Sequence, residues 1–179
     1  MAKRNVEEYR DLHNNPINNC GMCVGLINED CYDDWRITLT GPRDTSYKGG
    51  LFFMNIHFPP DYPNKAPEVY FITPIYHLNV NPCAPKKEGD ESLGHVCIST
   101  INWWKPEYKI REVLLNIYSL FYMTNVDSPY GINRAQEYKE DRDTYEEKVK
   151  YFTKKYANPK NNMNSKQAYE RDKDWDFNL

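Results

Sequence analysis

The residues whose chemistry stands out lie in one stretch of the chain, between His77 and Cys97. Its two ends read His77-Leu78-Asn79 and Gly94-His95-Val96-Cys97-Ile98-Ser99. A cysteine nucleophile needs thiolate character, solvent access and hydrogen-bond donors aimed at the oxyanion that forms when it attacks a carbonyl. Cys97 and the carboxamide of Asn79 could divide these roles. The stretch therefore predicts a covalent site centred on Cys97.

The chemistry of that site favours carrying an acyl group over hydrolysing one. No His or acidic residue stands at a recognisable spacing from Cys97 to complete a hydrolytic triad. A hydrolase must deprotonate water or a thiol, whereas thioester exchange can proceed with a mildly acidic thiol and an incoming amine. We therefore expect Cys97 to carry an acyl group. The alternative is a buried structural thiol, a common role for an unpaired cysteine.

Size and composition restrict the class of protein. The chain has 179 residues and a net charge of -3 at pH 7, with an isoelectric point of about 5.8 and a mean hydropathy of -0.86. These values predict a soluble chain with neither a nucleic acid nor a membrane as its main partner, and we expect it to be a monomer. We expect a cytoplasmic location, with the nucleus as a second one. The five cysteines are expected to be free thiols, because their number is odd and no secretory segment precedes them.

The spacing of apolar residues predicts an N-terminal helix, then four strands, then further helices. Helices are expected over residues 3–14, 110–121, 133–139 and 145–156, and strands over 22–27, 35–40, 50–57 and 68–72. Turn signals separate the strands, at Asp33-Asp34, Gly41 to Asp44 and Lys48 to Gly50. The order predicts an α+β domain over residues 1–157 with an antiparallel sheet. Residues 158–179 are expected to form a polar tail or a short helical extension, with a helix around 165–173.

Taken in order, these residues resemble the ubiquitin-conjugating enzymes. The resemblance covers residues 3–156 and rests on Trp35, Gly41-Pro42, Tyr47 to Phe52, Phe58 to Pro63, Ala66-Pro67, Tyr76 to Asn81, Gly94 to Ile98, Trp104-Lys105-Pro106, Val113-Leu114-Leu115 and Tyr138 to Arg142. Each motif alone is weak, whereas their order and spacing together are specific. The resemblance implies a four-stranded antiparallel sheet with an N-terminal helix, a central helix and C-terminal helices.

The resemblance also implies an activity and its partners. Cys97 would accept the C-terminal glycine of ubiquitin, or of a ubiquitin-like modifier, as a thioester from an activating enzyme. It would then pass the modifier to a lysine of a protein substrate or to a ligase cysteine, and a RING-type ligase would hold the substrate. No cofactor and no metal are implied. The alternatives are a catalytically impaired binding module on the same fold and an enzyme for a modifier other than ubiquitin.

Further roles come from the same resemblance. Asn79 matches an asparagine that either stabilises the oxyanion or orders the local loop, and His77 matches a mainly structural histidine. Ser128 stands where the family places a Ser, Thr or Asp beside the cysteine, near the incoming lysine, and Asp127 precedes it. Turn initiation before Pro129 is the alternative role for Ser128. Partner-binding residues are expected at Lys3, Arg4, Pro63, Asn64 and Pro106.

Three features depart from the family's pattern. Leu78 replaces a proline, which removes the restraint that the proline ring places on φ. An insertion over residues 82–93 separates His77 from Cys97, and it is expected to be a solvated loop, or a gating or ligase-contacting one. Asn64 stands where ligase-binding members often carry Phe. Because apolar anchors dominate such interfaces, Asn64 disfavours HECT-type ligases.

Two other patterns have a structural interpretation. Cys20 and Cys23 have the spacing of half a zinc site, which would have to be completed from Cys31, Cys83, His77 and His95. No second pair of ligands supports zinc, so we expect the two cysteines to pack at the start of the first strand. Trp103 and Trp104 are expected to form part of the core and a groove wall.

Overall fold

The computed structural model describes residues 3–18, 20–81 and 94–159. Their elements are α1 (Arg4–Asn14), β1 (Met22–Asn28), β2 (Cys31–Thr40), β3 (Leu51–His57), β4 (Glu68–Phe71), α2 (Ser99–Asn102), α3 (Ile110–Leu120), α4 (Ile132–Glu140) and α5 (Arg142–Tyr156). The four strands form one antiparallel sheet in the order β1-β2-β3-β4. The predicted α+β fold is confirmed. The predicted insertion over residues 82–93 and the helix around 165–173 lie outside the described residues.

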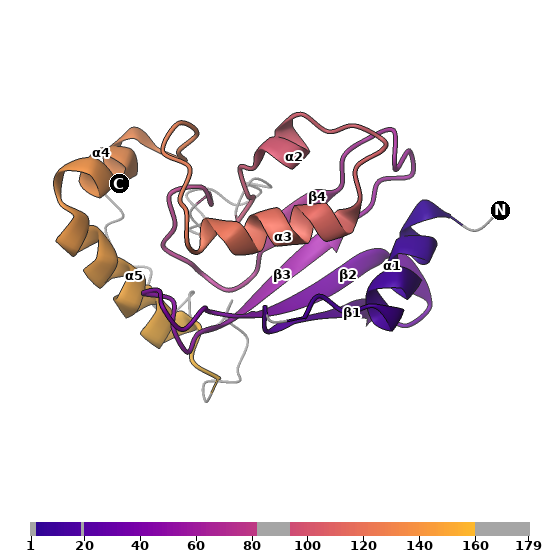
Figure 1. Ribbon diagram of the computed structural model, residues 1–179, viewed down its shortest axis with the longest axis horizontal. Coiled ribbons are helices and arrows are strands. Elements are labelled where there is room, and N and C mark those ends of the chain that lie inside the picture. Colours follow the sequence, from indigo (N-terminus) through magenta and orange to yellow (C-terminus); the bar gives the residue numbers. More distant parts are fainter. Residues whose placement is uncertain (1–2, 19, 82–93, 160–179) are drawn as a thin grey trace, which may run out of the picture.

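The larger helices lie in three groups around the sheet (Figure 1). Helix α3 lies across one face of the sheet, α1 lies against β1 and β2 at one end of the molecule, and α4 and α5 form a pair at the other end. In sequence, residues 77–97 follow α1 and the four strands and precede α2 to α5.

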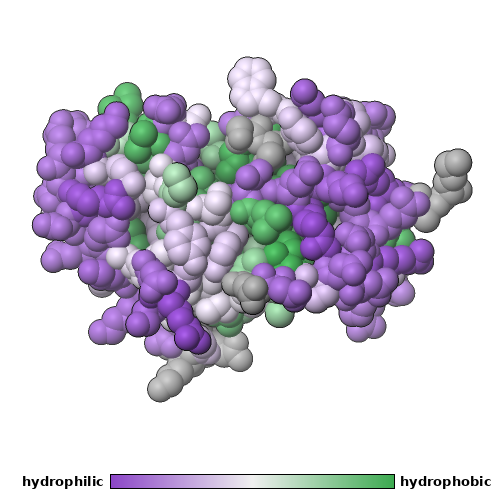
Figure 2. Space-filling view, viewed as in Figure 1, coloured by the Kyte–Doolittle hydropathy of each residue, from purple (hydrophilic) through white to green (hydrophobic). Residues whose placement is uncertain are grey.

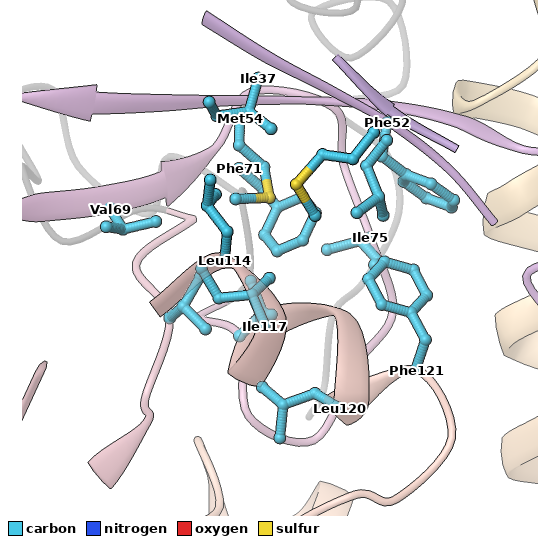
Figure 3. Close-up of a cluster of buried hydrophobic side chains, with 14 of the residues drawn as sticks. Ile37, Phe52, Met54, Val69, Phe71, Ile75, Leu114, Ile117, Leu120 and Phe121 are labelled. Carbon is cyan, nitrogen blue, oxygen red and sulfur yellow. The ribbon is translucent and has the colours of Figure 1, made fainter. Parts of the chain in front are cut away.

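The core lies between the sheet and α3, because apolar residues recur at every second position in the strands and at every third or fourth position in the helix. Alternate residues of β3, Phe52, Met54 and Ile56, are fully buried, as expected for a strand with one covered face. Helix α3 buries residues at spacings of three and four. Figure 3 shows these side chains meeting, with Ile37, Phe52, Met54, Val69, Phe71 and Ile75 on one side and Leu114, Ile117, Leu120 and Phe121 on the other.

The first turn of the sheet differs from the prediction. Asp33-Asp34 was expected to form a turn but lies inside β2, which pairs with β1 through a turn at residues 29–30. Both carboxylates have partners that make a strand position tolerable. Asp34 Oδ1 lies 2.7 Å from His57 Nδ1 on β3, and Asp33 Oδ1 accepts a hydrogen bond from Asn5 on α1 at 2.7 Å. The prediction was wrong because these partners are distant in sequence.

The surface is largely hydrophilic at the two ends of the molecule, and apolar side chains gather toward the middle of the face shown in Figure 2. Trp103 was expected in the core, but its exposed fraction is 77%, so that prediction is wrong; Trp104 is half-buried. Across the described ranges, none of the helices has the length and apolar character needed to cross a bilayer.

Candidate active site

The site is built on a buried segment without regular structure that follows β4. Every residue from 73 to 80 is buried, and buried backbone N–H and C=O groups must find hydrogen-bond partners. Distant side chains supply them: the Tyr47 hydroxyl donates to Tyr76 O at 2.9 Å, and Arg134 Nη1 donates to His77 O at 2.8 Å and to Val80 O at 3.1 Å. The segment is therefore held by the loop between β2 and β3 and by α4.

Cys97 is fixed next to this segment by its own backbone. Its N–H donates to Asn79 O at 2.8 Å, and its neighbours Val96 and Ile98 are 5% and 4% exposed. Because successive side chains of an extended chain point in opposite directions, the two buried neighbours direct the Cys97 side chain outward. The Cys97 thiol is accordingly free and partly exposed. The structure thus brings Cys97 and Asn79 together through the backbone.

Backbone hydrogen bonds connect Asn81 with Gly94 and His95, the residues on the two sides of the 82–93 interval. Gly94 N–H donates to Asn81 O at 3.1 Å, and Asn81 N–H donates to His95 O at 2.9 Å. Gly94 has φ +74°, and a Cβ there would lie 2.2 Å from the carbonyl oxygen of Phe71. Only glycine fits both the left-handed backbone and this close approach.

Asn102 is a neighbour of the thiol that the sequence did not indicate. It ends the short helix α2, and its Nδ2 lies 3.2 Å from Cys97 Sγ, within donating distance. An amide N–H in this position can donate a hydrogen bond to a sulfur that carries negative charge. Tyr130 is a second such neighbour: burial, and secondarily the charge of a Cys97 thiolate, raise the pKa of its phenol. Neither residue has a spacing from Cys97 that would single it out.

The carboxamide of Asn79 is fully occupied by a turn on the other side of the site. Its Nδ2 donates to Asn125 O at 2.7 Å and to Ser128 O at 2.9 Å, and its Oδ1 accepts from Asn125 N at 2.9 Å. Asn79 itself is 0% exposed. Of the two roles that the resemblance offered for Asn79, the observed bonds are those of loop ordering.

Ser128 and Asp127 lie on the turn that Asn79 holds. The backbone oxygen of Ser128 is one acceptor of the Asn79 amide, and Asp127 N–H donates to Asn125 Oδ1 at 3.0 Å, which tightens the turn. The Asp127 side chain is exposed and Ser128 is half-buried. The structure connects both residues to Cys97 by way of Asn79.

His77 is buried and neutral. Its Nδ1 accepts from Asn79 N–H at 2.9 Å, and its Nε2 therefore donates to Leu120 O, 3.1 Å away. Burial, and to a lesser extent the charge of Arg134, lower its pKa from 6.5 to about 4. With both ring nitrogens engaged, His77 stabilises the segment and is not placed to act as a base.

Leu78, the residue that replaces the family's proline, uses the N–H that proline lacks. This N–H donates to the Tyr145 hydroxyl at 3.0 Å, and Leu78 O accepts from Tyr130 N–H at 2.7 Å. The Leu78 side chain is 0% exposed. Burial raises the pKa of Tyr145 to about 12, so the phenol keeps its proton at neutral pH. Helix α5 thus supplies a restraint that a proline ring would otherwise provide.

Two of the residues expected to bind partners, Lys3 and Arg4, lie near a buried acid, Glu8 on α1. Glu8 Oε1 accepts from Arg4 Nε at 2.5 Å and from the Tyr62 hydroxyl at 2.8 Å, and Oε2 accepts from Ile110 N–H at 2.6 Å. Lys3 contacts Asp33 on the exposed surface at 3.3 Å. Glu8 therefore joins α1, the 61–65 loop and the start of α3, although its own sequence position carried no signal.

The other predicted partner residues surround Trp104. Its Nε1 donates to Pro63 O at 2.7 Å, and its ring lies 5.7 Å from the Tyr62 ring, centroid to centroid. Asn64 and Pro106 are exposed on the two segments that this hydrogen bond joins. The structure therefore brings Pro63, Asn64 and Pro106 to one surface.

The cysteine pair expected to pack at the start of the first strand is divided between core and surface. Cys20 is buried and Cys23 is exposed on β1. In the part of the chain that the structure describes, no group of three or more His, Cys, Asp or Glu side chains could hold a metal ion. Cys83 lies outside the described residues.

Comparison with protein-family models matches residues 4–153 to the ubiquitin-conjugating enzyme family. The chain belongs to this family, and the resemblance noted from its motifs is confirmed. Members of the family act in ubiquitin conjugation together with ubiquitin, an activating enzyme and a ligase.

The buried neutral His77 predicts a loss of stability in acid. Its pKa is about 4 in the folded chain and 6.5 when exposed, so its contribution is complete above pH 6.5 and is lost as the pH falls toward 4. We expect this residue to lower the free energy of unfolding by about 3 kcal/mol over that window. Urea unfolding at several pH values should therefore show a shallower acid loss in His77→Gln than in the parent. His13→Gln, at an exposed position, is the control, and equal slopes for parent and His77→Gln would contradict the assignment.

The Leu78–Tyr145 hydrogen bond predicts a coupling between the two positions. Tyr145→Phe leaves the Leu78 N–H buried without this acceptor, and we expect a loss of about 1–3 kcal/mol in unfolding free energy. In the background of Leu78→Pro, which has no N–H, the same substitution should cost much less. Tyr151→Phe, on the same helix but exposed, is the matched control. Equal costs of Tyr145→Phe in the two backgrounds, measured by chemical denaturation, would exclude the coupling.

Proposed function

We propose that Cys97 carries ubiquitin, or a ubiquitin-like modifier, as a thioester. The observation that supports this most is the position of the thiol: it is partly exposed between two buried neighbours, with the Asn102 amide 3.2 Å from its sulfur. A structural cysteine needs neither exposure nor an amide donor. Membership of the ubiquitin-conjugating enzyme family supplies the class of acyl group.

The proposed cycle has two acyl transfers. In the first, the Cys97 thiolate attacks the thioester of the charged activating enzyme, the new bond joins Sγ to the modifier's terminal carbonyl, and the activating enzyme's thiolate leaves. In the second, a lysine amine attacks that carbonyl, a C–N bond forms, and the Cys97 thiolate leaves while the amine gives up a proton. A ligase cysteine can replace the amine, in which case a new thioester forms. Neither step needs a cofactor or a metal.

Asn79 acts in this proposal by positioning the 125–128 turn. The turn carries Asp127, whose exposed carboxylate can orient the incoming ammonium group and accept its proton, and Ser128 beside it. Because all the hydrogen bonds of the Asn79 carboxamide are directed at this turn, the turn keeps one conformation before the amine arrives. Preorganisation of this kind lowers the cost of orienting the reactants.

The partners of the reaction would meet the surface around Glu8 and Trp104. The activating enzyme and a RING-type ligase would contact Lys3, Arg4, Pro63 and Pro106, and the polar Asn64 disfavours ligases that need an apolar anchor there. The substrates would be lysine-bearing proteins. We expect the enzyme to act as a monomer in the cytoplasm, with the nucleus as a second location.

The thioester is tested by charging. Incubation with an activating enzyme, ATP and ubiquitin should give a reductant-sensitive adduct of the chain on a gel, because only a thiol forms a bond that thiols reverse. Cys97→Ser should abolish this adduct, and Cys23→Ser, which removes another exposed thiol, should leave it unchanged. If no modifier forms the adduct, or if the adduct persists in Cys97→Ser, the proposal fails.

The role of Asn79 is tested by comparing stability with discharge. In Asn79→Ala the turn loses three hydrogen bonds, so we expect slower discharge to free lysine together with a stability loss of about 1–3 kcal/mol. Amide resonances of residues 125–128 should shift in the same variant. Ser128→Ala is the control for melting and for the resonances only, since Asn79 bonds the backbone oxygen of Ser128 and not its hydroxyl. Slower discharge with unchanged melting and unchanged resonances would instead assign Asn79 to the oxyanion.

A further inference from the structure

A cleft of about 450 Å³ lies at the end of the molecule formed by α5. One wall is the loop between β2 and β3, with Thr45, Ser46 and Lys48, and the other is the C-terminal half of α5 and the residues after it, with Lys150, Lys154 and Asn158. None of these residues is among Tyr47, Arg134 and Tyr145, whose side chains hold the 73–80 segment beside Cys97. In the view of Figure 2 the surface over α5 is strongly hydrophilic.

The two walls of the cleft are joined by tight contacts. Leu51 N–H donates to Ala157 O at 2.7 Å, and a Cβ at Gly50 would lie 2.8 Å from Thr153 Cγ2. Tyr47, in the middle of the loop, is 6% exposed and its hydroxyl is bonded to Tyr76 O. The cleft is therefore part of the folded domain and does not require a ligand to form it.

Three ammonium groups converge on this cleft from the two walls. Lys150 and Lys154 stand four residues apart on α5, so they share one face of the helix with their Cβ atoms about 6 Å apart, and Lys48 reaches in from the loop. Within the described residues, no carboxylate lies at ion-pair distance from any of the three. Glu146 and Glu147 stand four and three residues before Lys150; Glu146 is paired with Arg142 at 2.7 Å, and Glu147 forms no ion pair with Lys150 within the described residues. Like charges gathered without a counter-ion repel one another.

Stabilisation of the helix end explains only part of the cluster. A cation in the last turn of α5 interacts favourably with the helix dipole, which accounts for Lys154. Lys150 lies further from the helix end, and Lys48 comes from a different element. The total charge of the chain, -3, gives no general attraction for anions, so the cluster is a local feature.

We propose that this cleft binds an oligophosphate, a small molecule with two or more adjacent phosphate groups. The volume is in the range of small-molecule sites, and lysine ammonium groups bind phosphate as point charges without demanding one fixed geometry. Three cations within one cleft match a ligand that carries several adjacent negative charges better than they match a ligand with a single carboxylate. The site is separate from the thioester chemistry and does not depend on it.

The probe is inorganic tripolyphosphate, titrated into the full chain by calorimetry at low and at physiological ionic strength. We expect one site, weaker at the higher ionic strength because salt screens the charges. Lys150→Gln/Lys154→Gln should lower the affinity at least tenfold, and Lys48→Gln severalfold. The control pair Lys65→Gln/Lys139→Gln, which changes the net charge equally at exposed positions outside the cleft, should change it less than twofold. Thermal melting of each variant checks that it is folded.

Amide resonances locate the bound probe. Shifts confined to residues 45–51 and 150–159 support the cleft, and shifts elsewhere overturn it. An equal loss of affinity in the two double variants would show unspecific attraction, and a glutamate-rich peptide that binds while tripolyphosphate does not would show a protein partner instead; either result overturns the proposal. If the cleft is supported, titration with inositol hexakisphosphate and with a nucleoside triphosphate separates the two sources of such groups.

Discussion

The structure depends on one requirement, the pairing of backbone polar groups in the buried irregular segment over residues 73–80. The segment itself is neither helix nor strand, so most of its partners come from residues distant in sequence: Tyr47 before β3, Arg134 on α4, Tyr145 on α5 and the backbone of Tyr130. Leaving such a group unpaired costs about 1–3 kcal/mol each. The positions of α4 and α5 are thus tied to the same segment that fixes the backbone of Cys97.

Most polar side chains around the Cys97 thiol form hydrogen bonds that stabilise the backbone, so few of them are available to take part in a reaction. His77 is neutral with both nitrogens bonded, the Asn79 carboxamide holds the 125–128 turn, and Arg134 binds two carbonyl oxygens. What faces outward is the Cys97 sulfur, with Asn102 beside it. A thioester carrier suits this arrangement. The leaving thiolate of the charging step belongs to the activating enzyme, and the amine of the discharge step belongs to the substrate. A dedicated base beside the Cys97 sulfur is therefore not required.

The sequence predicted those features that follow from local periodicity. The alternation in β3 and the three- and four-residue spacing of α3 specify which faces are buried, and the motif order specified the family. Features that depend on distant partners were missed. Asp33-Asp34 looks like a turn until Asn5 and His57 are seen opposite it, and the N–H of Leu78 finds Tyr145 only in the fold. Trp103 shows the converse: its apolar character suggested burial, yet none of the elements that the structure describes covers it.

The paired hydrogen bonds between Asn81 and the 94–95 backbone bring residues 81 and 94 together on the two sides of the 82–93 interval. Because these hydrogen bonds fix the positions of residues 81 and 94, the number of residues between them does not alter the backbone on either side. Lengthening such an interval costs only about 0.6 kcal/mol per doubling, whereas position 94 itself admits no side chain, since Gly94 abuts the Phe71 carbonyl. We therefore expect a change of length between residues 81 and 94 to cost less stability than a side chain at Gly94.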